Sequence, residues 1–269
     1  MIEYRSVAKT FGDGAPAVRD FSLVLPSRTT TVLVGSSGCG KTTLLRMVNR
    51  MVDPTSGAVL IDDVDVATRN PVELRRSIGY VMQHSGLLPH RKVVDNVATP
   101  LRLTGVGRRD ARVRAMAALE TVGLDLALAD RYPAQLSGGQ QQRVGVARGL
   151  VADPNILLMD EPFGAVDPIV RVDLQNELLR LQRELGKTIV FVTHDVEEAF
   201  LLGDQVVILQ QGGEVAQVGT PAEILAAPAN EFVSSFVGLD RGRRTLRVEE
   251  IAGRRVVLDA DGRPAGVLA

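Results

Sequence analysis

The stretch VGSSGCGKTT, residues 34–43, contains residue types that can hold a nucleotide phosphate. Gly35, Gly40, Lys41 and Thr42 satisfy the spacing G-x-x-x-x-G-K-[ST], and an apolar run precedes them. Glycines let successive backbone N–H groups curl around an anion, and the start of a following helix adds partial positive charge. In such a loop the lysine reaches the outer phosphates and the hydroxyl binds Mg²⁺. We therefore predict a nucleoside triphosphate site formed by Gly35, Ser36, Ser37, Gly38, Cys39, Gly40, Lys41, Thr42 and Thr43, with Cys39 as a small residue without chemistry.

A second anion-binding pattern occurs in QLSGGQQQR, residues 135–143, where a serine and two glycines open a predicted helix. An ordinary helix cap by Ser137 is the alternative interpretation. That interpretation leaves unexplained why both patterns occur in one chain, since one phosphate group does not need two such cradles from one subunit.

Carboxylates and a histidine follow two apolar runs further along the chain. Asp160 and Glu161 end ILLMDEP, and His194 ends the run VTHD. Acidic residues after a buried strand are often only solvated, and a lone histidine is more often structural than catalytic. Here both sets follow a phosphate loop and end neighbouring strands, so we expect them at the edge of the sheet where ligands bind.

The elements expected around these residues alternate strands with helices. Strands are predicted over 2–7, 17–25, 30–34, 58–61 and 77–82, with a turn-rich run at 62–71 and a helix starting near Lys41. Residues 93–130 are predicted to be helical, and Pro133, a helix-breaking residue, marks the end of this stretch. Helices at 140–150, 168–185 and 196–201 then alternate with strands at 156–159, 188–193 and 205–209, before a turn at 210–213, a strand at 214–218 and a short helix from Pro221. This order predicts an α/β fold with a parallel sheet covered on both faces.

These motifs together resemble the ATP-binding subunit of an ABC transporter, in which LSGGQ is the signature that faces the nucleotide of a partner subunit. The resemblance covers Met1 to about Val237. It implies a P-loop NTPase with a RecA-like core, an antiparallel β subdomain and an inserted α-helical subdomain. The expected limits are 1–238 for the ATPase domain (core 1–84 and 154–238, helical subdomain about 85–153) and 239–269 for a short C-terminal tail.

The resemblance also implies roles for individual residues. ATP and Mg²⁺ are the expected ligands, with Thr42, Gln83 and Asp160 at the metal. Glu161 is the expected catalytic base, and His194 and Gln83 complete the catalytic set. Phe11 in AKTFGDG stands where the family has an adenine-stacking aromatic, usually Tyr; a core phenylalanine is the alternative, and Val18 is expected to flank the other face of the base. The partner-facing residues are Ser137, Gly138, Gly139 and Gln140, with Asp167 in AVD, residues 165–167, where Val166 replaces the usual Leu.

Composition limits the partners and the location. The 269-residue chain has a formal net charge of −1 and no block of like charges, which argues against a nucleic-acid surface. Cys39 is the only cysteine, no signal peptide is evident, and no apolar run reaches the ~18 residues of a membrane helix. We expect a peripheral protein on the cytoplasmic face of the membrane, acting as a homodimer or with a similar ATPase. Its expected partners are two permease subunits and, indirectly, an extracytoplasmic solute-binding protein.

Two sequence segments, less specific than the nucleotide motifs, indicate the solute. LLPHRKVVDNVATPLRL and FVGLDRGRRTLRV, residues 87–103 and 236–248, resemble ATPases of osmoprotectant importers for glycine betaine, choline, carnitine or proline. ATPases of amino-acid, polyamine and other type I importers remain open, as do a soluble ABC ATPase outside transport and an NTP-binding module without turnover. The tail is too short for the paired regulatory domain, similar to the cystathionine β-synthase module, that many osmoprotectant ATPases carry.

Overall fold

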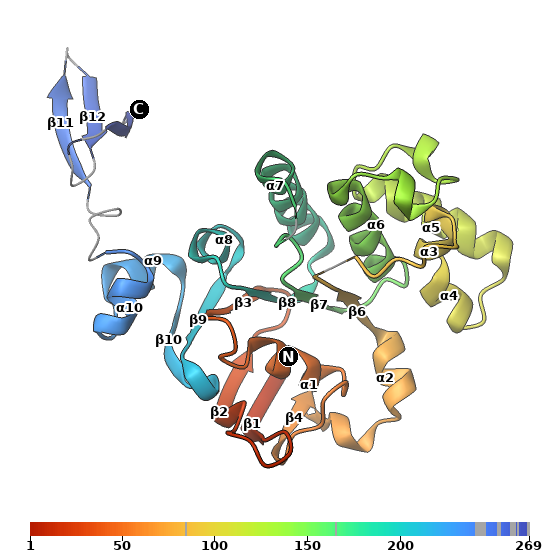
Figure 1. Cartoon of the computed structure of the whole chain (residues 1–269), viewed down its shortest axis with the longest axis horizontal. Helices are drawn as coiled ribbons and strands as arrows, with labels where there is room; N and C mark the ends of the chain where they lie inside the picture. Colours follow the sequence, from red (N-terminus) through yellow and green to blue (C-terminus); the bar gives the residue numbers. More distant parts are fainter. Residues whose placement is uncertain are drawn as a thin grey trace.

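The computed structural model describes residues 1–83, 85–164, 166–239, 246–251, 254–258, 262 and 264–267. A six-stranded sheet lies at its centre in the order β10-β9-β3-β8-β7-β6 (Figure 1). Its strands are β3 (Thr30–Gly35), β6 (Ile78–Val81), β7 (Ile156–Asp160), β8 (Thr188–Thr193), β9 (Gln205–Leu209) and β10 (Val215–Gly219). All neighbours are parallel except β10, which runs antiparallel to β9. The predicted α/β class with a parallel sheet is confirmed.

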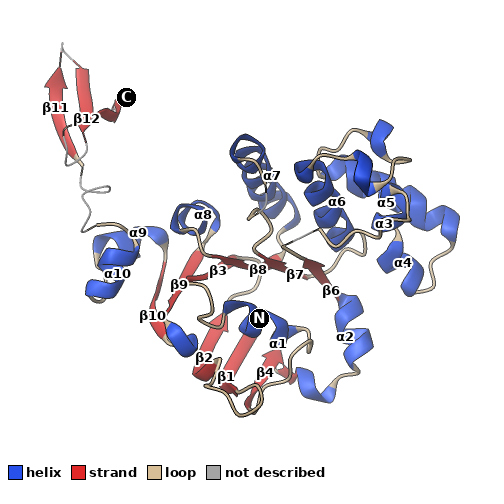
Figure 2. Cartoon of the chain, in the orientation of Figure 1, coloured by secondary structure: helices blue, strands red, loops and turns tan. Residues whose placement is uncertain are grey.

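A second, antiparallel sheet has the order β2-β1-β4-β5 and lies below the first in Figure 2. It consists of β1 (Ile2–Lys9), β2 (Val18–Leu25), β4 (Ser56–Ile61) and the short β5 (Val64–Asp65). Tyr4 and Phe21 pack edge to face between its strands, with ring centroids 5.0 Å apart. Helix α1 (Lys41–Val48) follows β3 and lies between the two sheets, so the loop before it sits where the layers meet.

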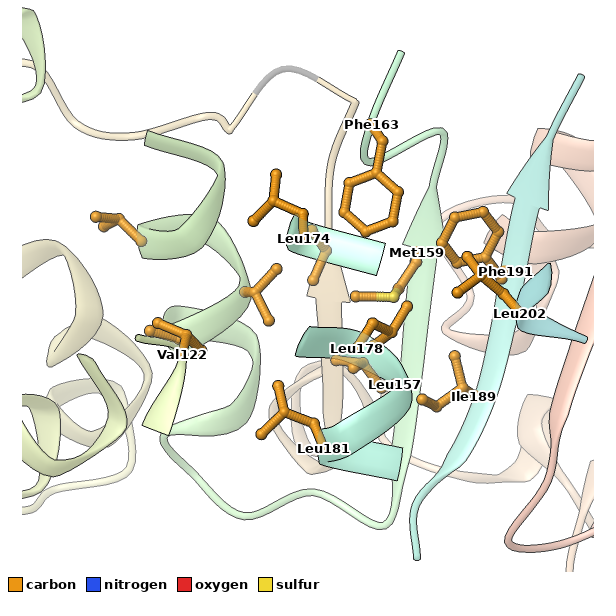
Figure 3. Packing of buried hydrophobic residues seen from close by; sticks show 14 of the residues in the cluster. Val122, Leu157, Met159, Phe163, Leu174, Leu178, Leu181, Ile189, Phe191 and Leu202 are labelled. Carbon is orange, nitrogen blue, oxygen red and sulfur yellow. The ribbon is translucent and has the colours of Figure 1, made fainter. Parts of the chain in front are cut away.

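The central sheet divides two apolar cores because successive side chains point to opposite faces. Leu158 and Val190 belong to the core shared with α1 and the antiparallel sheet. Leu157, Met159 and Phe191 belong to the other core. Figure 3 shows this second core, in which leucines of α7 (Pro168–Leu185) pack on the sheet: Leu174, Leu178 and Leu181. The strand ends that carry polar residues are therefore held in place by an apolar core on each face of the sheet.

The chain between β6 and β7 is mainly helical and packs beside the central sheet (Figure 1). It contains α3 (Val93–Val97), α4 (Thr99–Leu103), α5 (Arg108–Thr121), two 3₁₀ turns (Leu126–Leu128 and Pro133–Gln135) and α6 (Gly138–Leu150). The helices predicted over 93–130 end before Pro133, which takes the first position of a separate 3₁₀ turn, where its missing N–H is not needed. Helix α6 begins at the signature residues and runs from them toward β7.

Several elements differ from the expectations. Helix α2 (Pro71–Ser77), which was not predicted, is capped by Asn70, whose side chain accepts from the N–H groups of Val72 and Glu73. After α8 (Val196–Leu202), β9 and β10, the chain forms the predicted short helix α9 (Pro221–Ala226) and then α10 (Glu231–Phe236), which was not predicted. In the tail, β11 (Arg247–Ile251), β12 (Arg254–Leu258) and β13 (Pro264–Val267) form an antiparallel sheet that was not predicted. Within the described residues, no helix has both the length and the apolar composition to cross a membrane.

Candidate functional site

The loop between β3 and α1 has a backbone that only glycine adopts readily. Gly38 and Gly40 have φ angles of 79° and 110°. A Cβ on Gly40 would lie 2.7 Å from the backbone oxygen of Ala17 and 3.2 Å from Val18 Cγ2. A side chain at position 40 would therefore clash with the segment before β2. The two glycines let the loop turn tightly against the N-terminus of α1.

Lys41 lies inside this loop and is 4% exposed. Its Nζ donates to the backbone oxygens of Gly35 and Ser36, both at 2.8 Å, and lies 3.7 Å from Cys39 Sγ. None of the described carboxylates pairs with it. A buried ammonium that contacts only neutral groups still favours an anion nearby, which fits a phosphate at this loop.

Asp160, at the end of β7, receives hydrogen bonds on both carboxylate oxygens. Thr42 Oγ1 donates to Oδ1 at 2.7 Å, and Tyr80 donates its hydroxyl to Oδ2 at 3.0 Å. Arg46 Nη2 lies 3.2 Å from Oδ2, and its Nε donates to the Tyr80 oxygen at 3.4 Å. A hydroxyl and a carboxylate together are the hard oxygen ligands that Mg²⁺ prefers. The residues present thus fit the metal expected here.

Tyr80 and Arg46 were not predicted as site residues. Burial raises the pKa of Tyr80 to about 12, so its hydroxyl stays protonated and can donate at neutral pH. The hydrogen bond with Tyr80 raises the pKa of Arg46. The sequence hints at this role only through a phenol within an otherwise apolar predicted strand. In the structure, Tyr80 pairs with Leu158 of β7 in the sheet register.

Glu161 joins two other predicted catalytic residues through a single oxygen. Its Oε2 accepts from Gln83 Nε2 at 3.2 Å and lies 3.1 Å from His194 Nδ1. The backbone of Glu161 is left-handed, with φ 45°, and its N–H donates to the oxygen of Val192 on β8. A non-glycine residue in this region is unusual and marks a conformation imposed by its surroundings. The three side chains, from three separate strand ends, therefore converge.

A hollow of about 350 Å³ connects the loop to Gln83 and Glu161, whereas His194 lies outside its lining. It is lined by Ala17, Ser37, Gly38, Gly40, Lys41, Thr42, Thr43, Gln83 and Glu161. A cation, hydroxyls, a helix N-terminus and a carboxylate thus face one space. The arrangement can bind a polyphosphate and hold a water next to a carboxylate.

Phe11 and Val18, the two residues expected to flank the adenine ring, lie in different environments. Phe11 is 54% exposed, which excludes the alternative of a core phenylalanine, and Lys9 Nζ lies 5.0 Å from its ring centroid. Val18 is fully buried, with its methyl groups close to Gly40 and Gly213. Neither side chain lines the 350 Å³ hollow.

The signature residues lie outside the hollow, at the N-terminus of α6. Ser137 Oγ accepts from the N–H of Gln140 at 3.3 Å, and Gln140 Oε1 accepts from the N–H of Ser137 at 2.9 Å, which forms a capping box. The helix-cap interpretation of Ser137 is thus physically correct. A Cβ on Gly139 would lie 2.3 Å from Val170 Cγ1, so Gly139 allows α6 and α7 to approach closely. Gly138 is the first residue of the helix.

Helix α6 also contacts the chain on both sides of Gln83. Gln142 Nε2 donates to the oxygen of Met82 at 3.4 Å. Arg148 donates to the oxygens of Ser85 and Gly86 at 2.6 and 2.7 Å, and burial lowers the pKa of this guanidinium. These contacts were not predicted. They connect the helix that starts at the signature to the segment that starts at Gln83.

The remaining predicted residue, Asp167, caps α7: its side chain accepts from the N–H of Ile169 at 2.9 Å. Val166 is buried, and Ala165 lies outside the described residues, as do residues 240–245 within the string 236–248. Asp167 does not line the hollow.

Comparison with known proteins points to one family. Residues 18–164 match the family described as ABC transporter. The chain is 47% identical over 266 residues to the glycine betaine/carnitine/choline transport ATP-binding protein OpuCA of Bacillus subtilis, covering 97% of this chain and 70% of that protein. It is 48% identical over 241 residues to the carnitine transport ATP-binding protein OpuCA of Listeria monocytogenes, covering 90% of this chain but 60% of the relative's length.

Solved structures agree with these sequence matches. The ATP-binding cassette MJ0796, a dimer bound to ADP and Pi, has a TM-score of 0.75 and 34% identity, covering 82% of this chain and 99% of that one. The cassette CbiO1 of Clostridium perfringens, part of the transporter complex CbiONQ, has a TM-score of 0.76 and 29% identity, covering 88% and 94%. The predicted P-loop NTPase fold is confirmed.

Proposed function

Because this chain belongs to the ABC transporter family of ATP-binding cassettes, we propose that it hydrolyses ATP to energise solute import through separate membrane permeases. The observation that carries this proposal is the single hollow that the phosphate loop, Gln83 and Glu161 line together. A signature motif outside that hollow, at the start of α6, supports it further.

The loop residues hold the phosphates of ATP. Backbone N–H groups of residues 35–43 and the N-terminus of α1 face the phosphate chain, and Lys41 exchanges its carbonyl partners for phosphate oxygens. Phe11 stacks on the adenine, and Val18 supports the loop on that side. Thr42, Asp160 and Gln83 hold Mg²⁺, which when bound neutralises charge on the outer phosphates. Tyr80 and Arg46 fix the orientation of Asp160.

Glu161 acts as the base that takes a proton from the attacking water. Gln83 and His194 both contact Oε2 of Glu161, so they orient this carboxylate toward the hollow. Since Gln83 also starts the segment that Arg148 holds, its position depends on helix α6. His194 is exposed enough to contact the terminal phosphate when a nucleotide is present.

Two copies complete the site head to tail. Ser137, Gly138, Gly139 and Gln140 of one copy face the phosphates bound to the loop of the other, and Asp167 lies at the same interface. The dimeric state of MJ0796 supports this arrangement. The second subunit is either an identical copy of this chain or a similar ATPase. ATP stabilises the closed pair and hydrolysis releases it, which shifts the permeases between their conformations.

Residues 1–238 form the ATPase domain, with a core of 1–84 and 154–238 and a helical subdomain of about 85–153; residues 239–269 are the tail. The protein is peripheral on the cytoplasmic face of the membrane, bound to two permease subunits that receive solute from a binding protein. The solute is an osmoprotectant such as glycine betaine, choline or carnitine. The relatives from Bacillus subtilis and Listeria monocytogenes, which are ATP-binding proteins of glycine betaine, carnitine and choline transport, support this solute class.

The substitution Glu161→Gln tests the mechanism because it removes the base and keeps the shape of the side chain. We expect Mg-ATP binding to persist, phosphate release to fall by about 10²–10⁴-fold, and a dimer to accumulate with ATP on gel filtration. Glu73→Gln, on the exposed face of α2, is the control and should leave all three unchanged. Undiminished phosphate release by Glu161→Gln would refute this assignment.

The solute is tested separately in proteoliposomes that contain this chain with its permeases and binding protein. ATP-dependent uptake of radiolabelled glycine betaine or choline is expected. Uptake of arginine or spermidine in place of these quaternary amines would contradict the solute assignment but not the ATPase assignment.

A further inference from the structure

Helices α7 and α8 lie on the same face of the central sheet (Figure 1), and each of them buries one long polar side chain. Gln175 lies among the buried leucines of α7 and is 7% exposed. Glu198 lies beside the buried Ala199 and Leu202 of α8 and is 5% exposed. Gln175 Nε2 donates to Glu198 Oε1 at 3.0 Å. The proposed hydrolysis of ATP gives this pair no role so far.

Stability alone does not account for a buried pair of this kind. Burying polar groups costs free energy that their hydrogen bond at best offsets, and apolar residues of similar volume are often equally stable or more so. A hydrogen bond differs from an apolar contact because it has a preferred direction. The pair between Gln175 and Glu198 therefore fixes how α7 and α8 sit against each other.

The residue before His194 is attached to this buried pair. Burial raises the pKa of the Glu198 carboxyl, and the side chains of Thr193 and Gln175 oppose that shift by hydrogen-bonding to it. Thr193 is the last residue of β8, and its Oγ1 also accepts from the N–H of Asp195 at 3.0 Å. One buried hydroxyl thus joins Glu198 to both neighbours of His194.

The residue after His194 is attached to α7 through Arg171. Its Nη1 lies 3.7 Å from Asp195 Oδ2, and its charge also lowers the pKa of Glu198. Asp195 Oδ1 caps α8 by accepting from the N–H groups of Glu197 and Glu198 at 2.9 and 3.2 Å. Both flanks of His194 are therefore connected to the same helix, α7.

A small hollow of about 30 Å³ brings these groups next to the proposed catalytic residues. Six polar or charged residues line it: Glu161, Arg171, Thr193, His194, Asp195 and Glu198. His194 Nδ1 lies 3.1 Å from Glu161 Oε2, but the His194 side chain is 60% exposed. Because protein atoms cover little of this imidazole, its direction depends on the backbone that its two neighbours hold.

We propose that Gln175, Glu198 and Arg171 are positioning residues, which hold the strand end at His194 so that its imidazole faces Glu161. This inference rests on the proposed function, because it concerns the geometry of the proposed catalytic residues. Arg171 and Gln175 are four residues apart and lie on one face of α7. None of the three lines the nucleotide hollow, so turnover should depend on them and nucleotide binding should not.

The test measures phosphate release, Mg-ATP binding and thermal unfolding of the full chain. Gln175→Leu removes the donor to Glu198 and keeps a side chain of similar volume. We expect kcat to fall by about ten- to a hundredfold, while the KM for ATP and the affinity for Mg-ATP stay within about twofold. The exchange Gln175→Glu/Glu198→Gln reverses the amide and the carboxylate, and it should return kcat to within about threefold of the unmodified value.

Arg171→Gln and Arg183→Gln form a matched pair that does not disturb the buried amide. Both remove one guanidinium from α7, and Arg183 is exposed and does not line the small hollow. Only Arg171→Gln should lower kcat, by about fivefold or more. This pair decides the matter if Gln175→Leu does not fold.

Three results would overturn the positioning role. They are an unchanged kcat in folded Gln175→Leu, a folded exchange variant that stays as slow as Gln175→Leu, and equal kcat values for Arg171→Gln and Arg183→Gln. A loss of Mg-ATP affinity as large as the loss of kcat would also overturn it, since that result indicates general damage to the domain. Absence of phosphate release by the unmodified chain would instead refute the proposed function, so the two failures are distinguishable.

Discussion

At the level of single residues, the carboxylate of Asp160 is the most constrained group near the phosphate loop. Thr42 occupies one oxygen, and Tyr80 and Arg46 occupy the other. Groups that hydrogen-bond to a metal ligand fix its orientation and influence metal affinity as strongly as some ligands do. Tyr80 and Arg46 therefore belong to the site although they do not line the hollow.

Tyr80→Phe removes one hydroxyl and keeps the ring. Oδ2 of Asp160 then loses its donor on the β6 side, so the carboxylate becomes freer to rotate. We expect the Mg²⁺ concentration for half-maximal binding of a fluorescent ATP analogue to rise by about tenfold. Tyr132→Phe, outside the contacts of Asp160, should leave this concentration unchanged. A Tyr80→Phe protein with an unaltered Mg²⁺ titration would show that the hydroxyl has no role at the metal.

At the level of elements, α6 connects three features of the molecule. Its first turn contains the signature, its face at Gly139 packs on Val170 of α7, and Arg148 near its end holds the segment after Gln83. A shift of α6 would therefore move the signature and the Gln83 segment together. Glycine at position 139 serves packing in addition to any contact with a nucleotide.

Gly139→Ala and Gly145→Ala separate packing from helix propensity within the same helix. A Cβ at position 139 would meet Val170 Cγ1 at 2.3 Å, and a valine on a helix cannot rotate away easily. We expect Gly139→Ala to destabilise the protein by about 1–3 kcal/mol. At position 145 the nearest atoms are 3.7 Å away, so Gly145→Ala should be neutral or stabilise by up to about 1 kcal/mol. Thermal unfolding of both variants tests this prediction. A larger loss of stability in Gly145→Ala than in Gly139→Ala would contradict the close approach of α6 and α7.

At the level of the whole molecule, one chain contains the parts of a site but does not assemble them. Ser137 caps α6 and lies outside the hollow that Lys41 lines. The cassette MJ0796, which has the same fold, is a dimer. A head-to-tail pair would bring the signature of each copy to the loop of the other.

Mixing two defective chains tests this geometry. Lys41→Ala disables the loop and Ser137→Ala disables the signature, so each pure variant should lose nearly all phosphate release. In a mixed dimer, one site combines both defects and the other combines two intact halves. An equal mixture should recover up to about a quarter of the normal activity if the sites act independently. No recovery, with mixed dimers verified by native mass spectrometry, would argue that each site lies within one chain.

The sequence predicts best where local signals are strong. Helix α7 begins with Pro168 at its first position and ends before Gly186, and its predicted limits match those observed. Helix α2 was missed because the turn-like residues before it include its own cap, Asn70. The contact between Tyr80 and Asp160 depends on the register of β6 against β7, which a single sequence does not specify. The same holds for Arg148, since its acceptors are backbone oxygens.

The burial of Lys41 makes the proposed nucleotide site less sensitive to ionic strength than the exposed guanidinium groups of the helical region are. Mobile ions screen exposed charges over about 8–10 Å at physiological salt, but they cannot enter between a buried ammonium and its ligand. The guanidinium groups of Arg102 and Arg108 are exposed, whereas Lys41 is 4% exposed. As the salt concentration around the protein rises, contacts made by these exposed guanidinium groups should weaken while the nucleotide remains bound. Ionic strength should therefore weaken any contact of these guanidinium groups with an acidic partner without emptying the proposed nucleotide site.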